Sequence, residues 1–126
     1  MARDEITIQL PTIESSQSVG VEVIATQAVT VANGITLKNA MECMNNTLFI
    51  ILNNTASADS TITIKKGDKF PNSILGDLTL SVAKSAITVL QIQDPARFIN
   101  SNGNIDIDFA TGFAGTIYAI GKKVGL

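Results

Sequence analysis

The stretch that decides the fold class is Leu48-Phe49-Ile50-Ile51-Leu52, the longest uninterrupted apolar run in the chain. This run is about a quarter of the roughly 20 residues that a membrane-spanning helix needs. It is apolar in both alternating phases, which is typical of a strand covered on both sides. We therefore predict a core strand here, with either Leu48, Ile50 and Leu52 or Phe49 and Ile51 facing a second sheet.

Other segments alternate between apolar and polar residues with a period of two. Ile, Val and Thr dominate the composition, and such β-branched side chains pack well on a pleated sheet. Turn signals such as Asn33-Gly34 and Asn102-Gly103 separate the alternating runs. We predict an all-β, two-sheet antiparallel β-sandwich, with Ala83–Ala86 as a turn and almost no helix. The expected strands are 18–25, 28–32, 35–38, 47–53, 60–65, 77–83, 86–92, 96–99, 104–109 and 115–121, and the core is expected to include Ile62, Ile64, Leu78, Leu80, Ile105 and Ile107.

The composition argues against several classes of function. The chain has 126 residues, of which 45% are hydrophobic and 16% charged, so it is expected to form one folded domain. Nine basic and eleven acidic residues provide no electrostatic footprint for nucleic acid or an anionic membrane. His and Trp are both absent, which removes the commonest general base and the commonest nitrogen ligand for metals. We therefore expect no enzyme, no cofactor, and neither nucleic acid nor membrane as a partner.

The N-terminal segment differs from the rest of the chain. Ile6, Ile8 and Leu10 alternate, but Pro11 and a polar run follow them. Residues 1–17 are therefore predicted to be an arm and linker, and residues 18–126 the β-sandwich domain. The arm should pair as an edge strand or dock on a partner, which makes Ile6, Ile8 and Leu10 candidate protein-interface residues. Its contacts are expected to lie outside the core, so that deleting residues 1–12 would leave the sandwich folded. The acidic start has no signal-peptide pattern.

Two residue patterns could carry catalysis, and neither has the context it needs. Ser81 and Lys84 match the Ser-x-x-Lys spacing, but that spacing brings the two groups together only on a helix, whereas Ser81 lies in an alternating run. Cys43 has no histidine to activate it, and we interpret it as a small buried hydrophobe or a half-exposed turn residue. A hydrolase that uses Ser81 and Lys84 is thus the least favoured hypothesis.

One further pattern could bind a metal ion. Asp106 and Asp108 follow Asn102 and Asn104, and oxygen ligands of this kind suit calcium. Residues two apart on a strand lie about 6.5 Å from each other, too far to chelate one ion without a third group, so a solvated outer face is favoured. The basic segment 65–69 is interpreted as a hairpin tip, and the sequons at Asn45 and Asn53 are assigned to turns.

The order of motifs along residues 45–121 resembles small capsid-associated proteins of tailed bacteriophages, of the head decoration or cement type. The stretches that carry the resemblance are Asn46–Thr55, Ser60–Asp68, Gly76–Ala83, Ala96–Phe98, Asn102–Asp108 and Gly115–Ile120. It implies a jelly-roll-like sandwich without enzymatic activity or cofactor, and residues 1–44 lie outside it.

The resemblance also implies a setting. The partner would be the major capsid protein, the assembly a homotrimer, and the location the capsid surface of a virion, after synthesis in the host cytoplasm. The alternative hypothesis is a β-sandwich module of a phage tail or fibre that recognises carbohydrate or a host surface, which would require exposed aromatic side chains over a shallow groove.

Overall fold

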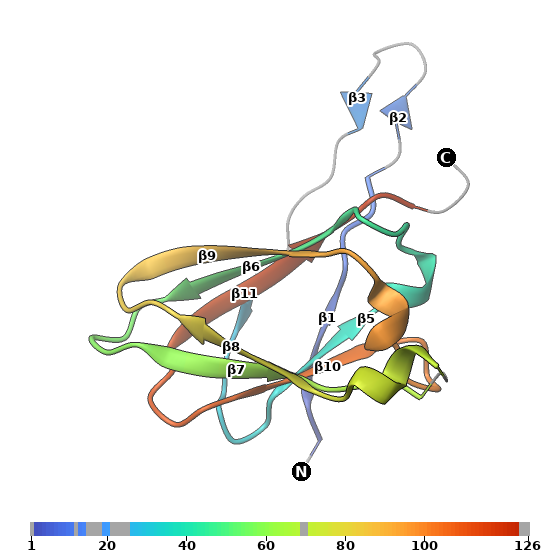
Figure 1. Cartoon of the computed structure of the whole chain (residues 1–126). Coiled ribbons are helices and arrows are strands. Elements are labelled where there is room, and N and C mark those ends of the chain that lie inside the picture. The colour runs from blue at the N-terminus through green and yellow to red at the C-terminus, as the bar shows by residue number, and fades with distance from the viewer. Residues whose placement is uncertain (1, 12, 15–18, 21–25, 69–70, 124–126) are drawn as a thin grey trace.

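A computed structural model describes residues 2–11, 13–14, 19–20, 26–68 and 71–123, and it has the predicted all-β architecture of two packed sheets (Figure 1). The five-stranded sheet has the order β1 (Asp4–Thr7), β5 (Ile35–Lys38), β10 (Ile105–Phe109), β7 (Ser60–Ile64) and β8 (Leu78–Val82). The four-stranded sheet has the order β4 (Gln27–Ala28), β11 (Gly115–Ile120), β6 (Leu48–Asn54) and β9 (Ala86–Ile92). A third pair, β2 (Ile13–Glu14) with β3 (Val19–Gly20), stands apart from both sheets in Figure 1.

The strands from β4 to β11 pair in a nested order. β7 pairs with β8, β6 with β9, β5 with β10, and β4 with β11, all antiparallel. Further antiparallel pairs, β10 with β7 and β11 with β6, complete the two sheets. The chain therefore crosses between the sheets at every connection in this span except the β7–β8 hairpin.

The core lies between the sheets and uses one phase of each strand. Leu48, Ile50 and Leu52 are fully buried, so this phase of β6 faces the second sheet. Ile62, Ile64, Ile105 and Ile107 face them from the five-stranded sheet and are also fully buried. Leu78 and Leu80 of edge strand β8 are half-buried against this cluster, so they contribute less to the core than the sequence predicts.

The predicted strand over 96–99 is wrong. This segment contains the 3₁₀ helix η3 (Pro95–Arg97), because Pro95 occupies its first turn and the Asp94 side chain accepts a hydrogen bond from the Ala96 N–H. Two more 3₁₀ helices, η1 (Ala40–Glu42) and η2 (Asn72–Leu75), occur among the described residues. None of the described helices has the length and apolar character needed to cross a membrane.

The strand predicted over 28–32 is also mostly wrong. β4 ends at Ala28, and a turn closes when Asn33 and Gly34 both donate backbone hydrogen bonds to the Thr30 carbonyl. Of the strand predicted over 18–25, Val19–Gly20 is a strand, and residues 21–25 lie outside the described part of the chain. The turn predicted between β8 and β9 is confirmed.

The N-terminal segment forms edge strand β1, as predicted, but it belongs to the core. β1 pairs with β5 in parallel, which departs from the otherwise antiparallel pattern. Ile6 is 6% exposed and Ile8 only 2%. Beyond β1, Gln9 exchanges hydrogen bonds with β11, which belongs to the other sheet: its N–H donates to the Ala119 carbonyl and its carbonyl accepts from Gly121.

These contacts correct the expectation that the arm lies outside the core. The segment connects the two sheets at one edge of the sandwich, and the burial of Ile6 and Ile8 is complete within a single chain. The role of Ile6, Ile8 and Leu10 in an interface between chains stays a prediction. The proposed domain boundary at residue 17 lies outside the described residues.

Candidate functional site

The outer faces of the two sheets differ sharply in polarity. The five-stranded sheet turns a polar face outward, made of Thr36, Thr61, Thr63, Thr79, Ser81, Asp106 and Asp108. The register places mainly apolar side chains on the outer side of the four-stranded sheet. We call these residues the apolar face: Phe49, Ile51, Ile87, Val89, Tyr118 and Ile120.

The apolar face is continuous across three strands. Ile51 of β6 lies between Val89 of β9 and Tyr118 of β11 in the sheet register, and it is only 8% exposed although it points away from the core. Ile87 and Val89 are 67% and 58% exposed. Asn53, Gln91 and Thr116 are polar neighbours on the same side of the sheet. Large contiguous apolar patches on small domains are common at interaction sites, which makes this face the candidate site.

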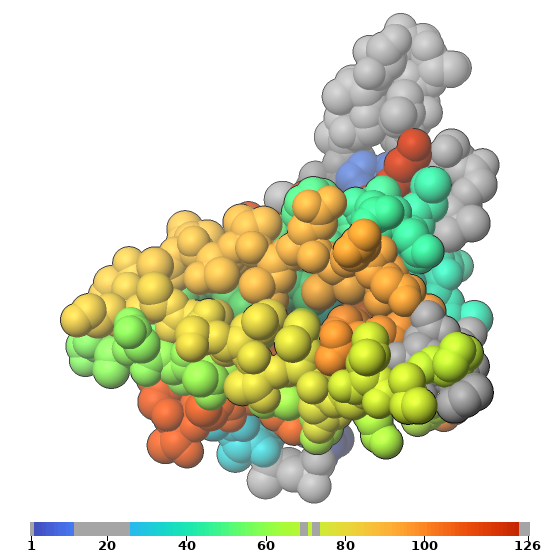
Figure 2. Space-filling model, viewed as in Figure 1, coloured from blue at the N-terminus to red at the C-terminus, as the bar shows by residue number. Residues whose placement is uncertain are grey.

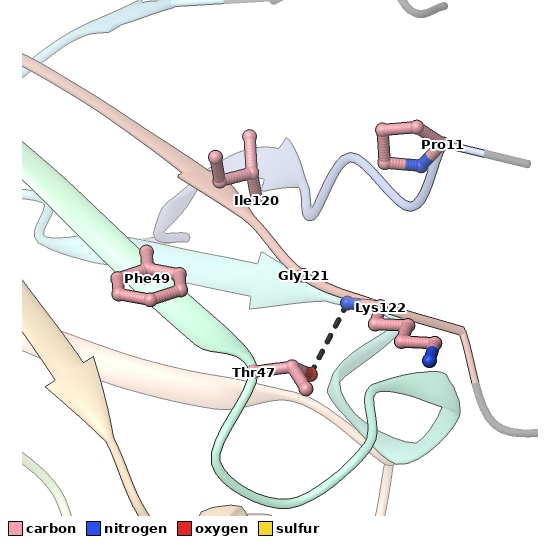
Figure 3. Close-up of a pocket in the computed structure, with 6 residues that line it drawn as sticks. All are labelled: Pro11, Thr47, Phe49, Ile120, Gly121 and Lys122. Carbon is pink, nitrogen blue, oxygen red and sulfur yellow. Dashed lines mark hydrogen bonds between the residues drawn. The ribbon is translucent and has the colours of Figure 1, made fainter. Parts of the chain in front are cut away.

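One end of the apolar face is hollowed into a pocket of about 250 Å³ (Figure 3). Phe49, Ile120 and Pro11 form its apolar walls, and Thr47, Gly121 and Lys122 complete it. Two hydrogen bonds hold the Thr47 side chain in place at the pocket. Its hydroxyl donates to the Met44 carbonyl at 2.7 Å and accepts from the Lys122 N–H at 3.1 Å. A pocket of this size can receive one apolar side chain of a partner.

A glycine is required beside this pocket because the chain passes close to a buried cysteine. A Cβ added at Gly121 would lie 2.3 Å from the Cys43 Sγ and 3.4 Å from Leu10 Cδ2. Cys43 itself is 5% exposed and belongs to the core cluster, so its interpretation as a small buried hydrophobe is confirmed.

The opposite, polar face carries a network of charges. Arg3 forms ion pairs with Asp108 and, at 3.7 Å, with Asp106, and it also donates to the Ile107 carbonyl. Asp106 additionally accepts from the Thr36 hydroxyl at 2.8 Å. Asp106 and Asp108 thus lie on the outer face predicted for them, with cationic and hydroxyl partners. Among the residues that the structure describes, no group of three or more His, Cys, Asp or Glu side chains gathers.

At the edge of this network, Lys65 and Asp77 join β7 to the start of β8. The Lys65 Nζ lies 3.0 Å from Asp77 Oδ2, and the Lys66 N–H donates to Asp77 Oδ1 at 2.7 Å. The Lys66 N–H and then the Lys65 ammonium hold the pKa of Asp77 below its ordinary value of 3.8. Hydrogen bonding and attraction to Asp77 raise the pKa of Lys65 above 10.5.

We predict a small loss of stability when the carboxyl group of Asp77 is protonated. Because its pKa is lowered in the folded state, the Asp77 carboxylate stabilises the fold above pH 3.8, and this contribution disappears as the pH falls through the folded pKa. Both side chains are well exposed, so the effect should be modest. A carbon-detected NMR titration of Asp77 should give a midpoint below 3.8, and Lys65→Ala should move that midpoint upward. A midpoint at or above 3.8 would contradict the prediction.

The structure also places the other residues that the sequence analysis considered for catalysis or as turns. Ser81 lies on β8 and Lys84 in the turn that follows, so the helical spacing required by the Ser-x-x-Lys pattern does not occur. Asn45 lies in a turn, as predicted, whereas Asn53 belongs to β6. Lys65 and Lys66 follow β7 directly, and residue 69 lies outside the described part.

The side chains of Asn54 and Arg97 stabilise the ends of the sandwich by hydrogen bonds. Neither of these structural roles was predicted from the sequence. The fully buried Asn54 accepts from the Ala56 N–H at 3.1 Å and donates to the carbonyls of Val82 and Ala83. The Arg97 guanidinium lies 4.9 Å from the centre of the Phe98 ring and donates to the Gly76 carbonyl. Asn54 thus fixes the end of β6 to the end of β8, and Arg97 fixes η3 to the segment between η2 and β8.

The apolar face was also missed, although the sequence contained a signal for it. Segment 86–92 is apolar in both phases, with Ile87 and Val89 in one and Leu90 and Ile92 in the other. Such a pattern indicates a strand covered on both sides.

Comparison with known protein families, curated proteins and solved structures finds no match to this chain.

Proposed function

We propose that the protein is a structural binding module that docks its apolar face on a repeated protein lattice and reinforces it. The contrast between the two outer faces carries this proposal: one is polar and ion-paired, and the other is apolar over three strands. Fully desolvated apolar patches with a polar surround are the usual centres of protein interfaces.

The resemblance to head decoration proteins of tailed phages suggests which lattice this is. On that reading the partner is the major capsid protein, the site of action is the virion surface, and the chain is no enzyme but forms a homotrimer when it docks on the capsid. The nested pairing of β4 to β11 supports the jelly-roll-like part of the same proposal, because a jelly roll places eight strands in two sheets.

The alternative function, recognition of carbohydrate or a host surface at a tail or fibre, receives less support. Ring-stacking on a sugar needs an exposed aromatic platform. Phe49 and Tyr118 are the two aromatic residues of the apolar face, and both are half-buried.

The first test asks whether a capsid protein is encoded beside the gene and, with that protein, whether the chain binds the heads it forms. Expanded heads assembled from that capsid protein are sedimented with the purified chain, and we expect saturable co-sedimentation at a fixed ratio to capsid subunits. The double variant Tyr118→Lys, Ile120→Lys should bind more than about tenfold more weakly, since it places two charges in the centre of the contact. Failure of the unmodified chain to sediment with the heads would overturn the proposal, as would a gene neighbourhood without a capsid protein.

The control for this test is Thr61→Lys, Thr63→Lys. These residues are half-buried and lie on the outer face of β7, which is an inner strand of its sheet, as β11 is of the other. Binding by this variant should match that of the unmodified chain. Equal weakening in both double variants would mean that charge alone, and not the apolar face, controls binding.

A further inference from the structure

The two sides of the sandwich differ in how their edge strands are protected against pairing with other chains. At one side, β1 carries Asp4 and Glu5, with Glu5 3.8 Å from Lys38, and β4 has only two residues. At the other side, β8 and β9 contain no charged residue, and Figure 2 shows both strands in yellow and gold on the face toward the viewer. Charges and short lengths are the usual means by which edge strands avoid pairing with other chains. The β8–β9 side lacks both.

The hydrogen bonds show which backbone groups of β9 are free to pair. Thr55 donates to the Ala114 carbonyl at 2.8 Å in continuation of the β6–β11 register, so odd-numbered residues of β6 bond to β11. The even-numbered residues of β6 therefore bond to β9, and their partners in the register are also even-numbered, as in Ile50 with Leu90. The N–H and C=O groups of Ile87, Val89 and Gln91 are left pointing away from the sheet, and no described strand pairs with them.

The same argument applies to β8, which serves as a comparison. Ala110 donates to the Thr61 carbonyl at 3.0 Å, so odd-numbered residues of β7 bond to β10 and even-numbered ones to β8. The free backbone groups of β8 therefore belong to Thr79 and Ser81. The difference lies in the side chains, because β8 offers Thr79 and Ser81 at its open edge where β9 offers Ile87 and Val89. Among the four edge strands of the two packed sheets, β9 is the one that combines an open backbone edge with large exposed apolar side chains.

We propose that β9 pairs antiparallel with β9 of a second copy of this chain, joining two four-stranded sheets into one continuous sheet. A second copy fits this edge because β9 is uncharged, so two identical strands meet without like-charge repulsion. A two-fold axis near Thr88 would place Ile87 of one copy opposite Val89 of the other and would satisfy the free backbone groups of both. The contact is an additional property of the chain: it uses the β9 edge of the apolar face and leaves Tyr118 and Ile120 on β11, two strands away, free for lattice docking.

The test measures mass and amide exchange on the isolated full chain. Light scattering between about 10 μM and 1 mM should give twice the chain mass of 13.3 kDa. Hydrogen exchange at the amides of Ile87 and Val89 should slow as the concentration rises, while the Ser81 amide should not change. Val89→Pro removes an outward N–H that no β6 carbonyl uses and should yield a monomer, since proline is tolerated on the solvent side of an edge strand.

A second variant and a matched control keep the proposal falsifiable. Val89→Lys leaves the backbone intact and places a charge opposite the apolar Ile87 of the second copy, so it should also be monomeric even if Val89→Pro fails to fold. Ser81→Pro and Ser81→Lys, at the corresponding edge positions of β8, should remain dimeric. A monomeric unmodified chain across this range, a trimeric mass, or a dimer unaffected by Val89→Lys would each overturn the β9 pairing. Lattice docking is judged separately, by co-sedimentation with heads.

Discussion

Deleting residues 1–12 is expected to destabilise the sandwich severely or to prevent its folding. The deletion removes β1 together with Ile6 and Ile8, which are 6% and 2% exposed. Truncating one such isoleucine to alanine costs about 2 to 5 kcal/mol, and a domain of this size has about 5 to 15 kcal/mol in total. The hydrogen bonds of Gln9 with Ala119 and Gly121 would be lost as well.

Thermal unfolding followed by far-UV circular dichroism measures this effect. Single variants separate the loss of core packing from the shortening of the chain. Ile8→Ala should lower the melting temperature strongly, whereas Glu5→Ala, at an exposed position of β1, should change it little. A truncated chain that melts within a few degrees of the full chain would show that β1 is dispensable, as the sequence alone had suggested.

Ile50→Ala is expected to cost about 2 to 5 kcal/mol of unfolding free energy, because it opens a cavity at the centre of the core. Ile50 is fully buried on β6, with β9 and β11 on either side of it. Leu80→Ala should cost less, since Leu80 is half-buried at an edge. Both losses can be measured as shifts in urea unfolding.

Ile87→Ala provides the control for this series. Its side chain is 67% exposed, so the free energy of unfolding of the monomeric form should change by less than about 0.5 kcal/mol. If Ile50→Ala cost no more than Ile87→Ala, the assignment of the inward phase of β6 would be wrong.

Local patterns in the sequence predicted most of the sandwich. The run at Leu48–Leu52 and the alternation at Ile105–Phe109 indicated strands that the structure contains, because burial of one phase imposes a period of two. The choice between the two phases of β6 could not be made locally, since Phe49 and Ile51 are as apolar as Leu48 and Ile50. Only the packing of β6 against the second sheet distinguishes the inner phase from the outer one.

The errors came from interactions between distant segments or from local capping. Segment 96–99 was expected to be a strand, but Asp94 and Pro95 start a 3₁₀ helix there. The alternation at Ile6, Ile8 and Leu10 is too short to indicate a core strand, and its partners, β5 for β1 and β11 for Gln9, are distant in the sequence. The apolar face became visible only when the register placed Val89, Ile51 and Tyr118 side by side.

The nested pairing of β4 to β11 also determines when the domain can fold during its synthesis. Within the span from β4 to β11, the β7–β8 hairpin is the only connection that joins neighbours in one sheet, so it can form as soon as both strands have left the ribosome. Each later strand then pairs with one made progressively earlier, and β4 receives its partner only when β11 emerges. Pairing between segments this distant in sequence is slow. During translation the nascent chain therefore exposes the apolar strand β6 until β9 is complete, and a ribosome-associated chaperone that binds short apolar segments would find its main target at Leu48–Leu52.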